Sequence, residues 1–210
     1  MAFVVAPSEN TKEWVAWRLK WATPIPPMTI QIPAQIMVLA EFGGKTLPLS
    51  QGVHTLVSAA ETFKSLHPGL RPTVTNLKLT AFHASPSTEG TFGFAMDGLS
   101  ASGWTNQRIR IRGSYRIRVL SPENVYRHFG LIEKEFLALN DVFEALRPKW
   151  TEVLKKTLGQ FAKEYGYVDL TMHPERFKDA AIKAAEIPLY PLGLQVVDLT
   201  IVGLDKAATI

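Results

Sequence analysis

The sequence predicts an α+β protein: a twisted, mostly antiparallel sheet of about five to six strands, three helices packed on one side, and a C-terminal strand after the helices. Two observations lead to this fold class. Residues 28–120 are short apolar runs rich in Val, Ile, Thr and Phe between Gly, Pro and Ser, which is typical of strands. From residue 121 the apolar positions recur every three or four residues, which is typical of helices, and residues 194–204 return to a strand pattern.

The strand region is expected to begin with a hairpin. Residues 30–39 and 47–58 flank Phe42-Gly43-Gly44-Lys45, where two glycines supply the positive φ of a tight turn. Further strands are predicted at 74–83, 91–96 and 107–120.

The helical region is expected to open at Ser121 and Pro122, because Ser caps exposed amides and Pro suits a first helical position. This first helix is short and ends near Phe129. A long second helix is predicted from one apolar face: Val142, Leu146, Trp150, Val153, Leu154, Leu158, Phe161 and Tyr165. Pro148 either kinks it or lies in its first turn. The third helix opens at His173-Pro174-Glu175 and ends at Pro188 and Pro191.

The domain organisation expected from composition is a single domain over residues 28–205, with an aromatic extension at 1–27 and a tail at 206–210. Of the 210 residues, 46% are hydrophobic and 20% charged, as in an ordinary globular protein. No apolar run approaches the roughly 18 residues of a membrane span, and residues 1–10 do not have the pattern of a signal peptide. We therefore expect a cytoplasmic protein, peripheral to the inner face of the membrane if it binds one.

Catalytic and metal-binding patterns are missing from the sequence. There is no cysteine, and the five histidines show no HxH, HxxxH or HExxH spacing. No nucleophile elbow, P-loop or dinucleotide fingerprint occurs. We therefore expect no catalytic residues, no metal and no cofactor, and a protein that is not an enzyme.

One strand carries a row of arginines. The even positions 108, 110, 112, 116 and 118 are arginine, and the odd positions 109, 111, 115, 117 and 119 are Ile, Ile, Tyr, Ile and Val. Because strand side chains alternate between faces, the pattern predicts a core face backed by a basic face roughly 30 Å long. Its guanidiniums either pair with acidic residues of a neighbouring strand or bind lipid phosphates, nucleic-acid phosphates or an acidic subunit face. The five residues are Arg108, Arg110, Arg112, Arg116 and Arg118.

A second candidate is the aromatic stretch of residues 13–21. If it is helical, Trp14, Trp17 and Trp21 fall on one side with Arg18 and form an interfacial membrane anchor. If it is extended, Trp17 and Trp21 share a face with Val15 and Leu19 and pack in a core.

Three motifs in this order resemble the SPFH or Band 7 family of stomatins, prohibitins and flotillins. Residues 36–56 (IMVLAEFGGKTLPLSQGVHTL) are similar to the family's strand, glycine turn and strand ending in G-x-H-x-L. Residues 111–123 (IRGSYRIRVLSPE) resemble its long strand ending in Y-R-I-x-D-P-E, with Ser121 where Asp is frequent. Residues 192–205 (LGLQVVDLTIVGLD) resemble its later strand G-I-x-V-x-x-V-x-I. The soluble virion core protein-like subgroup is the most similar.

The resemblance implies a non-enzymatic scaffold domain that self-associates or recruits partner proteins at an anionic membrane surface, and hence a homo-oligomer. Residues 206–210 do not lead into the family's long coiled coil, so either the chain is part of a longer one or assembly uses the domain itself. The alternative is a nucleic-acid-binding domain that uses the strand from Arg108 to Arg118, although a net charge of +4 is small for that class.

Overall fold

The computed structural model describes residues 2–6, 13–20, 28–84, 89–99, 107–165 and 167–207. The chain divides into two compact units, each built from two segments, whereas the sequence analysis expected one domain. Unit 1 comprises Met1–Pro86 and Val119–Leu139, and unit 2 comprises Ser87–Arg118 and Asn140–Ile210. Within the described residues the fold class is confirmed as α+β with mostly antiparallel sheets and a C-terminal strand after the helices.

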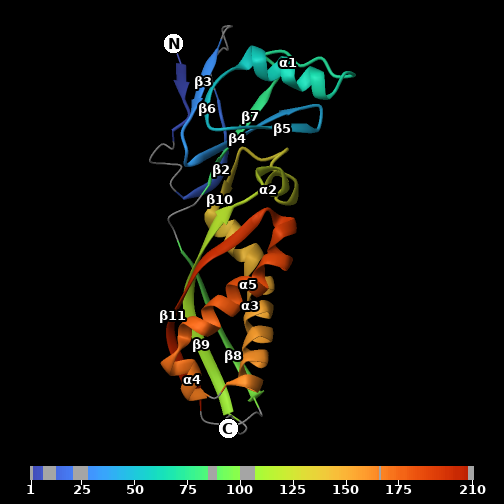
Figure 1. The fold of residues 1–210 in the computed structure, drawn as a ribbon. Coiled ribbons are helices and arrows are strands. Elements are labelled where there is room, and N and C mark those ends of the chain that lie inside the picture. Colours follow the sequence, from blue (N-terminus) through green and yellow to red (C-terminus); the bar gives the residue numbers. More distant parts are fainter. Residues whose placement is uncertain are drawn as a thin grey trace. The chain divides into compact units, whose positions relative to one another are not determined.

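Unit 1 contains two sheets, in the strand orders β1-β3-β6 and β10-β2-β7-β4-β5 (Figure 1). β1 runs parallel to β3, and the other pairs are antiparallel. Its elements are β1 (Ala2–Val4), β2 (Trp14–Arg18), β3 (Thr29–Ile32), β4 (Ile36–Phe42), β5 (Lys45–Leu49), β6 (Gly52–Thr55), α1 (Leu56–Leu66), β7 (Lys78–His83), α2 (Pro122–His128) and β10 (Phe136–Ala138).

The predicted hairpin is confirmed as β4 and β5, paired in register from Val38↔Leu49 to Phe42↔Lys45. Gly43 and Gly44 form its turn with φ values of 57° and 72°, a region that residues with a Cβ avoid. One face of the five-stranded sheet contributes Val38 and Leu79 to a buried apolar cluster that also includes residues of α1.

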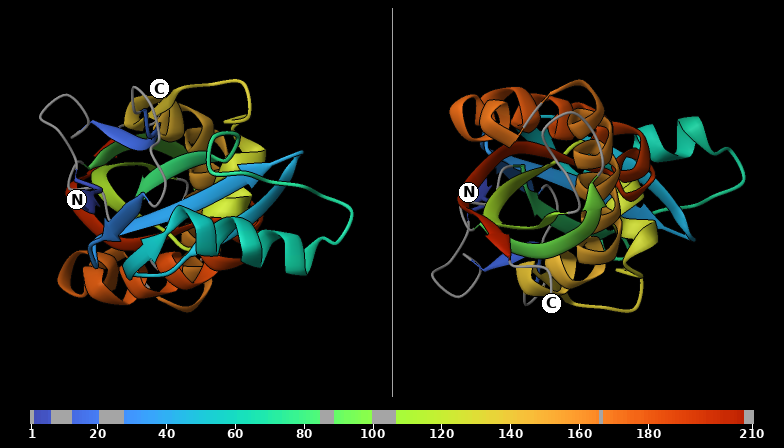
Figure 2. Two further views of the ribbon diagram at one scale, coloured as in Figure 1. Left: turned by 90° about the horizontal axis from the view of Figure 1, so that it is seen from above. Right: turned by 90° about the horizontal axis from the view of Figure 1, so that it is seen from below.

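Unit 2 contains the sheet β11-β9-β8, whose strands curve strongly (Figure 2). The elements are β8 (Gly90–Leu99), β9 (Gln107–Val119), α3 (Leu139–Glu164), α4 (Tyr167–Met172), α5 (Pro174–Leu189), the 3-10 turn η2 (Tyr190–Leu192) and β11 (Leu194–Ala207). The predicted apolar face of α3 is confirmed, because its positions from Val142 to Phe161 are buried. Trp150 lies at its centre, with its ring centroid 5.4 Å from that of Tyr115 and 6.5 Å from that of Phe92.

Several details differ from the expectation. The described residues form three sheets rather than one, and five α-helices rather than three. α1 was missed because the strand pattern of β6 runs directly into it, and Thr55 ends the strand by accepting a hydrogen bond from Ser58 N at 3.1 Å. Pro148 and Pro188 lie inside α3 and α5, although Pro188 was expected to end its helix. Burial of the apolar faces outweighs the backbone hydrogen bond that each proline removes.

Candidate anion-binding surface

The even-numbered side chains of β9 lie on the outer face of the unit 2 sheet, as the alternation predicts. Ile109, Ile111, Tyr115 and Ile117 are buried, whereas four of the five arginines are exposed and Arg108 is half-buried. We call this outer row the arginine face: Arg108, Arg110, Arg112, Arg116 and Arg118.

The arginine face is bordered on one side by polar residues of β11. Arg112 Nη2 lies 3.3 Å from Asp205 Oδ2, and Arg116 Nη2 lies 2.8 Å from Asp198 Oδ2. Arg118 Nε donates to Gln195 Oε1 at 2.8 Å. Cross-strand pairing, the first of the two alternatives for these arginines, is therefore present at Arg112 and Arg116. The residue numbers of these partners decrease along β11 as those of the arginines increase along β9, so the two strands are antiparallel.

The alternation of buried and exposed side chains shifts by one residue within β11, and this shift positions Asp198. Leu194 and Val196 are buried, but the next buried side chain is Leu199, so one extra residue intervenes, as in a β-bulge. Asp198 Oδ1 accepts a hydrogen bond from Leu199 N at 2.9 Å and lies 3.0 Å from Lys178 Nζ of α5. The hydrogen bond from Arg116, followed by that from Lys178, lowers the pKa of Asp198 to about 2. The hydrogen bond with Asp198 raises the pKa of Lys178.

The β8 side of the arginine face is bordered by small residues. Ala95 lies opposite Arg110, Gly93 opposite Arg112, and Thr91 opposite Ser114. Arg110 makes no ion pair with any side chain that the structure describes. The side chains of Arg112 and Arg116 keep 63% and 49% of their surface exposed despite their ion pairs. Since Arg110 and Arg118 have no carboxylate partner among the described residues, the surface keeps a positive charge.

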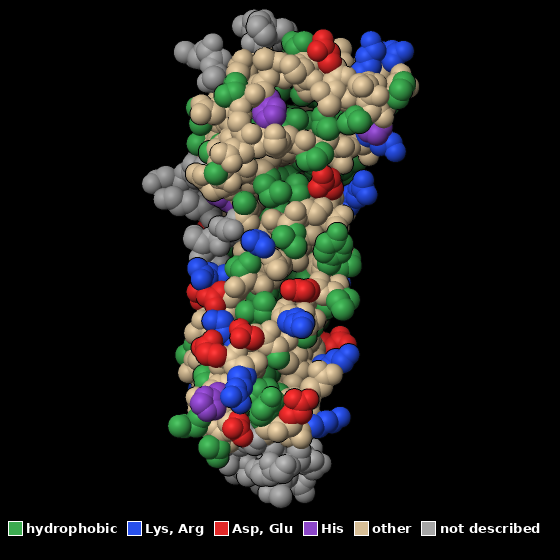
Figure 3. Space-filling view, viewed as in Figure 1, with side chains coloured by type: hydrophobic (Ala, Val, Ile, Leu, Met, Phe, Trp, Pro, Cys, Tyr) green, Lys and Arg blue, Asp and Glu red, His purple; other side chains and the backbone are tan. Residues whose placement is uncertain are grey.

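A row of guanidiniums on alternate residues of a strand can contact several anions at once. Successive outward side chains are roughly 7 Å apart, and each guanidinium presents paired N–H donors that match phosphate or carboxylate oxygens. The helix face of unit 2 differs, because acidic and basic side chains are interspersed there (Figure 3). The arginine face differs from that helix face in presenting five arginines in one row.

The tryptophans of the aromatic stretch lie in unit 1. Residues Trp14–Arg18 form β2, so they adopt the extended alternative rather than the helical arrangement that an interfacial anchor requires. Trp17 is 6% exposed and lies beside His83, with 4.9 Å between ring centroids. Trp14 stacks on Phe136 at 4.6 Å. Trp21 lies outside the described residues.

A buried polar cluster in unit 1 was not predicted from the sequence. Glu41, at the end of β4, is 4% exposed; its Oε1 accepts from Gly44 N at 3.2 Å, and its Oε2 lies 3.7 Å from Lys78 Nζ. Tyr126 of α2 is buried nearby, and burial, followed by the charge of Glu41, raises its pKa, whereas Arg18 lowers it. The sequence feature that could have indicated this cluster is Glu41, a single carboxylate in the otherwise apolar run of β4. The cluster ties the β4–β5 turn and α2 to the sheet, which is a structural role.

Within the described ranges, no helix is long and apolar enough to cross a bilayer. A search against protein-family models finds no match for this chain, and a search of curated proteins finds no match either.

Proposed function

We propose that the chain is a non-enzymatic scaffold domain of the SPFH type, which self-associates and recruits partner proteins at an anionic membrane surface that it contacts through the arginine face. The observation that carries the proposal is the outward row of five arginines, in which Arg110 and Arg118 have no carboxylate partner among the described side chains. The SPFH assignment rests on the order of the three motifs. It is supported by the elements at these motifs, which are the hairpin of β4 and β5, the strand β9 followed by α2, and the late strand β11.

The strength of the membrane contact follows from the charge count. A basic residue near an anionic bilayer contributes about 1 kcal/mol. The two arginines without a carboxylate partner, Arg110 and Arg118, therefore supply about 2 kcal/mol, which gives weak, reversible binding. Screening is strong, because the Debye length is only about 8 Å at physiological ionic strength. Such binding suits a peripheral protein whose avidity comes from several copies.

Two open sheet edges in unit 2 support self-association. In the strand order β11-β9-β8, neither β8 nor β11 pairs with another described strand on its outer side. Such edges present unpaired backbone N–H and C=O groups, to which another strand can add. β11 also exposes Val197 and Val202 to solvent. Addition of β8 of one copy to β11 of the next would join unlike surfaces, and such contacts build rings or filaments.

The non-enzymatic part of the proposal draws support from the titratable groups. Each resolved pKa shift has a cause in the fold: burial for Tyr115 and Tyr126, and ion pairs for Glu135, Lys178 and Asp198. None of these groups is brought together with a nucleophile and a base, the arrangement that acyl-transfer chemistry requires.

The proposal is tested by sedimentation with vesicles of phosphatidylcholine containing phosphatidylserine. The test variant is Arg110→Ser, Arg112→Ser, Arg116→Ser. The control removes the same charge from exposed helix positions: Lys155→Ser, Lys163→Ser, Lys183→Ser. We expect the wild type and the control to sediment at low salt and the test variant to stay in the supernatant.

Equal sedimentation of both triple variants, each with a native circular dichroism spectrum, would refute the membrane contact. Binding of generic DNA by the wild type, without vesicle binding, would favour the nucleic-acid alternative instead. Light scattering on a gel-filtration peak tests self-association separately, and a strict monomer at high concentration would exclude it.

A further inference from the structure

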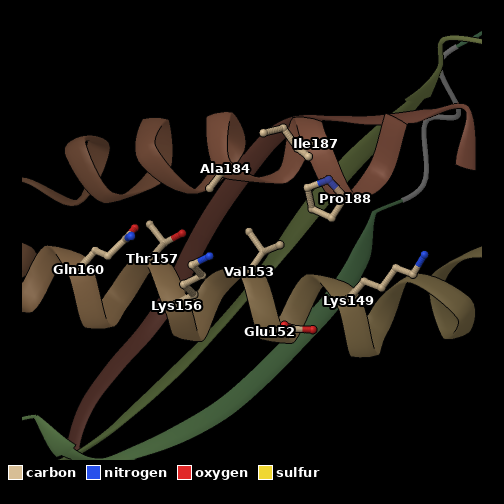
Figure 4. A pocket seen from close by; sticks show the side chains of 9 residues that line it. All are labelled: Lys149, Glu152, Val153, Lys156, Thr157, Gln160, Ala184, Ile187 and Pro188. Atoms are coloured by element: carbon tan, nitrogen blue, oxygen red, sulfur yellow. The ribbon is translucent and has the colours of Figure 1, made fainter. Parts of the chain in front are cut away.

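A hollow of about 600 Å³ lies between α3 and α5 of unit 2, away from the residues of the arginine face (Figure 4). Ala184 and Pro188 point from α5 toward α3, and Val153 faces them from α3. Ile187 stands at the rim with 85% of its surface exposed. The volume is in the range of small-molecule sites, and these walls are apolar.

A polar atom in one wall lacks a partner. Thr157 is 4% exposed, lines the hollow and points from α3 into the gap. Its hydroxyl oxygen is buried and makes no hydrogen bond to any atom in the part of the chain that the structure describes. Since a buried hydroxyl without a partner is costly, this atom indicates a ligand group that exchanges a hydrogen bond with it.

The charged residues around the hollow are mainly basic. Lys149 and Lys156 are two turns apart on α3, and both line the hollow (Figure 4). Among the described side chains neither lysine makes an ion pair, and Glu152 stays close to α3 between them. Lys156 is next to Thr157 in the chain, so a cation and a hydroxyl lie at the same end of the apolar walls.

We propose that this groove binds a small anionic amphiphile, whose carboxylate or phosphate meets Lys156 and Thr157 and whose alkyl chain lies on Val153, Ala184 and Pro188. The lining of α3 extends from Lys149 to Gln160, roughly 16 Å at 1.5 Å per residue. This length suits a medium-length alkyl chain. The head group neutralises Lys156, and the chain covers the apolar walls.

The test is calorimetric titration of the full chain with sodium decanoate, and with decyltrimethylammonium as the amphiphile of opposite charge. We expect decanoate to bind more tightly than the cation. Lys156→Met should weaken decanoate binding about tenfold, and Thr157→Val about threefold, as expected for loss of a charged and of a neutral hydrogen bond. The matched control is Lys155→Met, since Lys155 faces Met96 and Pro148 instead; it should leave the affinity unchanged.

Four results would overturn the proposal. The first is equal binding of the two amphiphiles, and the second is wild-type affinity in Lys156→Met. The third is a change of oligomeric state, rather than of decanoate affinity, in Lys156→Met and Thr157→Val, since the groove would then belong to an interface between copies. Loss of decanoate binding in the arginine triple variant would also contradict it. That variant separates this site from the membrane contact, because only the latter needs the arginine face.

Discussion

Asp198→Asn should lower stability and strengthen anion binding at the same time. The Asp198 carboxylate, with 26% of its side chain exposed, is shared by Arg116 at 2.8 Å and Lys178 at 3.0 Å. The amide of Asn keeps the oxygen that accepts from Leu199 N but loses both charge interactions. The substitution therefore removes electrostatic stabilisation and leaves two cations without their carboxylate.

The stability change follows from the two ion pairs. A partly exposed ion pair contributes about 0.2–1 kcal/mol, so we expect the loss of both to lower the free energy of unfolding by about 1 kcal/mol at pH 7. The pKa of Asp198 is lowered from 3.8 to about 2 by folding. Its contribution is thus complete above pH 4 and is lost as the pH falls toward 2. The difference between wild type and variant should shrink over the same range.

The assay is urea unfolding followed by circular dichroism, at pH 7 and at pH 2.5, at low salt. The matched control is Asp205→Asn, whose single ion pair with Arg112 is longer, at 3.3 Å, and more exposed. Asp205→Asn should lower the free energy of unfolding by no more than a few tenths of a kcal/mol. A difference between Asp198→Asn and wild type that is as large at pH 2.5 as at pH 7 would refute the electrostatic explanation. Anionic-vesicle binding should rise severalfold in Asp198→Asn, and an unchanged affinity would mean that Arg116 does not reach the lipid.

Three further substitutions test the packing. Gly113→Ala should lower the free energy of unfolding by about 3 kcal/mol, because a Cβ there would overlap the Thr200 carbonyl oxygen and lie 2.7 Å from the Phe92 ring. Gly93→Ala on the paired strand has room for the Cβ, so its free energy of unfolding in urea should stay within about 0.5 kcal/mol of the wild type. Glu41→Ala should lower the free energy of unfolding by about 2 kcal/mol. Glu41→Gln should lower it less, since the amide oxygen still accepts a hydrogen bond from Gly44 N in the β4–β5 turn, and equal losses in the two variants would contradict this explanation. Burial raises the pKa of Tyr115 to about 12. The free energy of unfolding of the wild type should therefore fall between pH 10 and 12 more steeply than that of Tyr115→Phe. The same pH dependence in both proteins would contradict the raised pKa.

The sequence was most informative where one periodicity runs unbroken. β9 alternates from Arg108 to Val119, and the apolar face of α3 recurs over many turns, so both elements and their buried faces were predictable. α1 has an apolar face of its own at Leu56, Ala59, Ala60 and Phe63, but the strand-forming residues of β6 precede it without a break. The short β10 and α4 leave too few residues for a periodicity to be recognised.

Tertiary relations were not predictable from local pattern. Each unit joins two distant chain segments, and no feature of either segment alone indicates its partner. The acidic partners of the arginine face also required the structure. Asp198 and Asp205 could be proposed as pairing residues only once β11 was known to lie beside β9, and the contact from Lys178 depends on the bulge in β11.

The membrane contact is tested most directly by a fluorophore placed on the arginine face. The chain contains no cysteine, so Ser114→Cys creates a single thiol, on the outward side of β9 between Arg112 and Arg116. An environment-sensitive dye at this position should shift its emission to the blue when phosphatidylserine vesicles are added at low salt, and a dye at Lys163→Cys on α3 should not. A shift at position 163 with none at position 114, or no shift at either, would contradict the proposal that the arginine face meets the membrane.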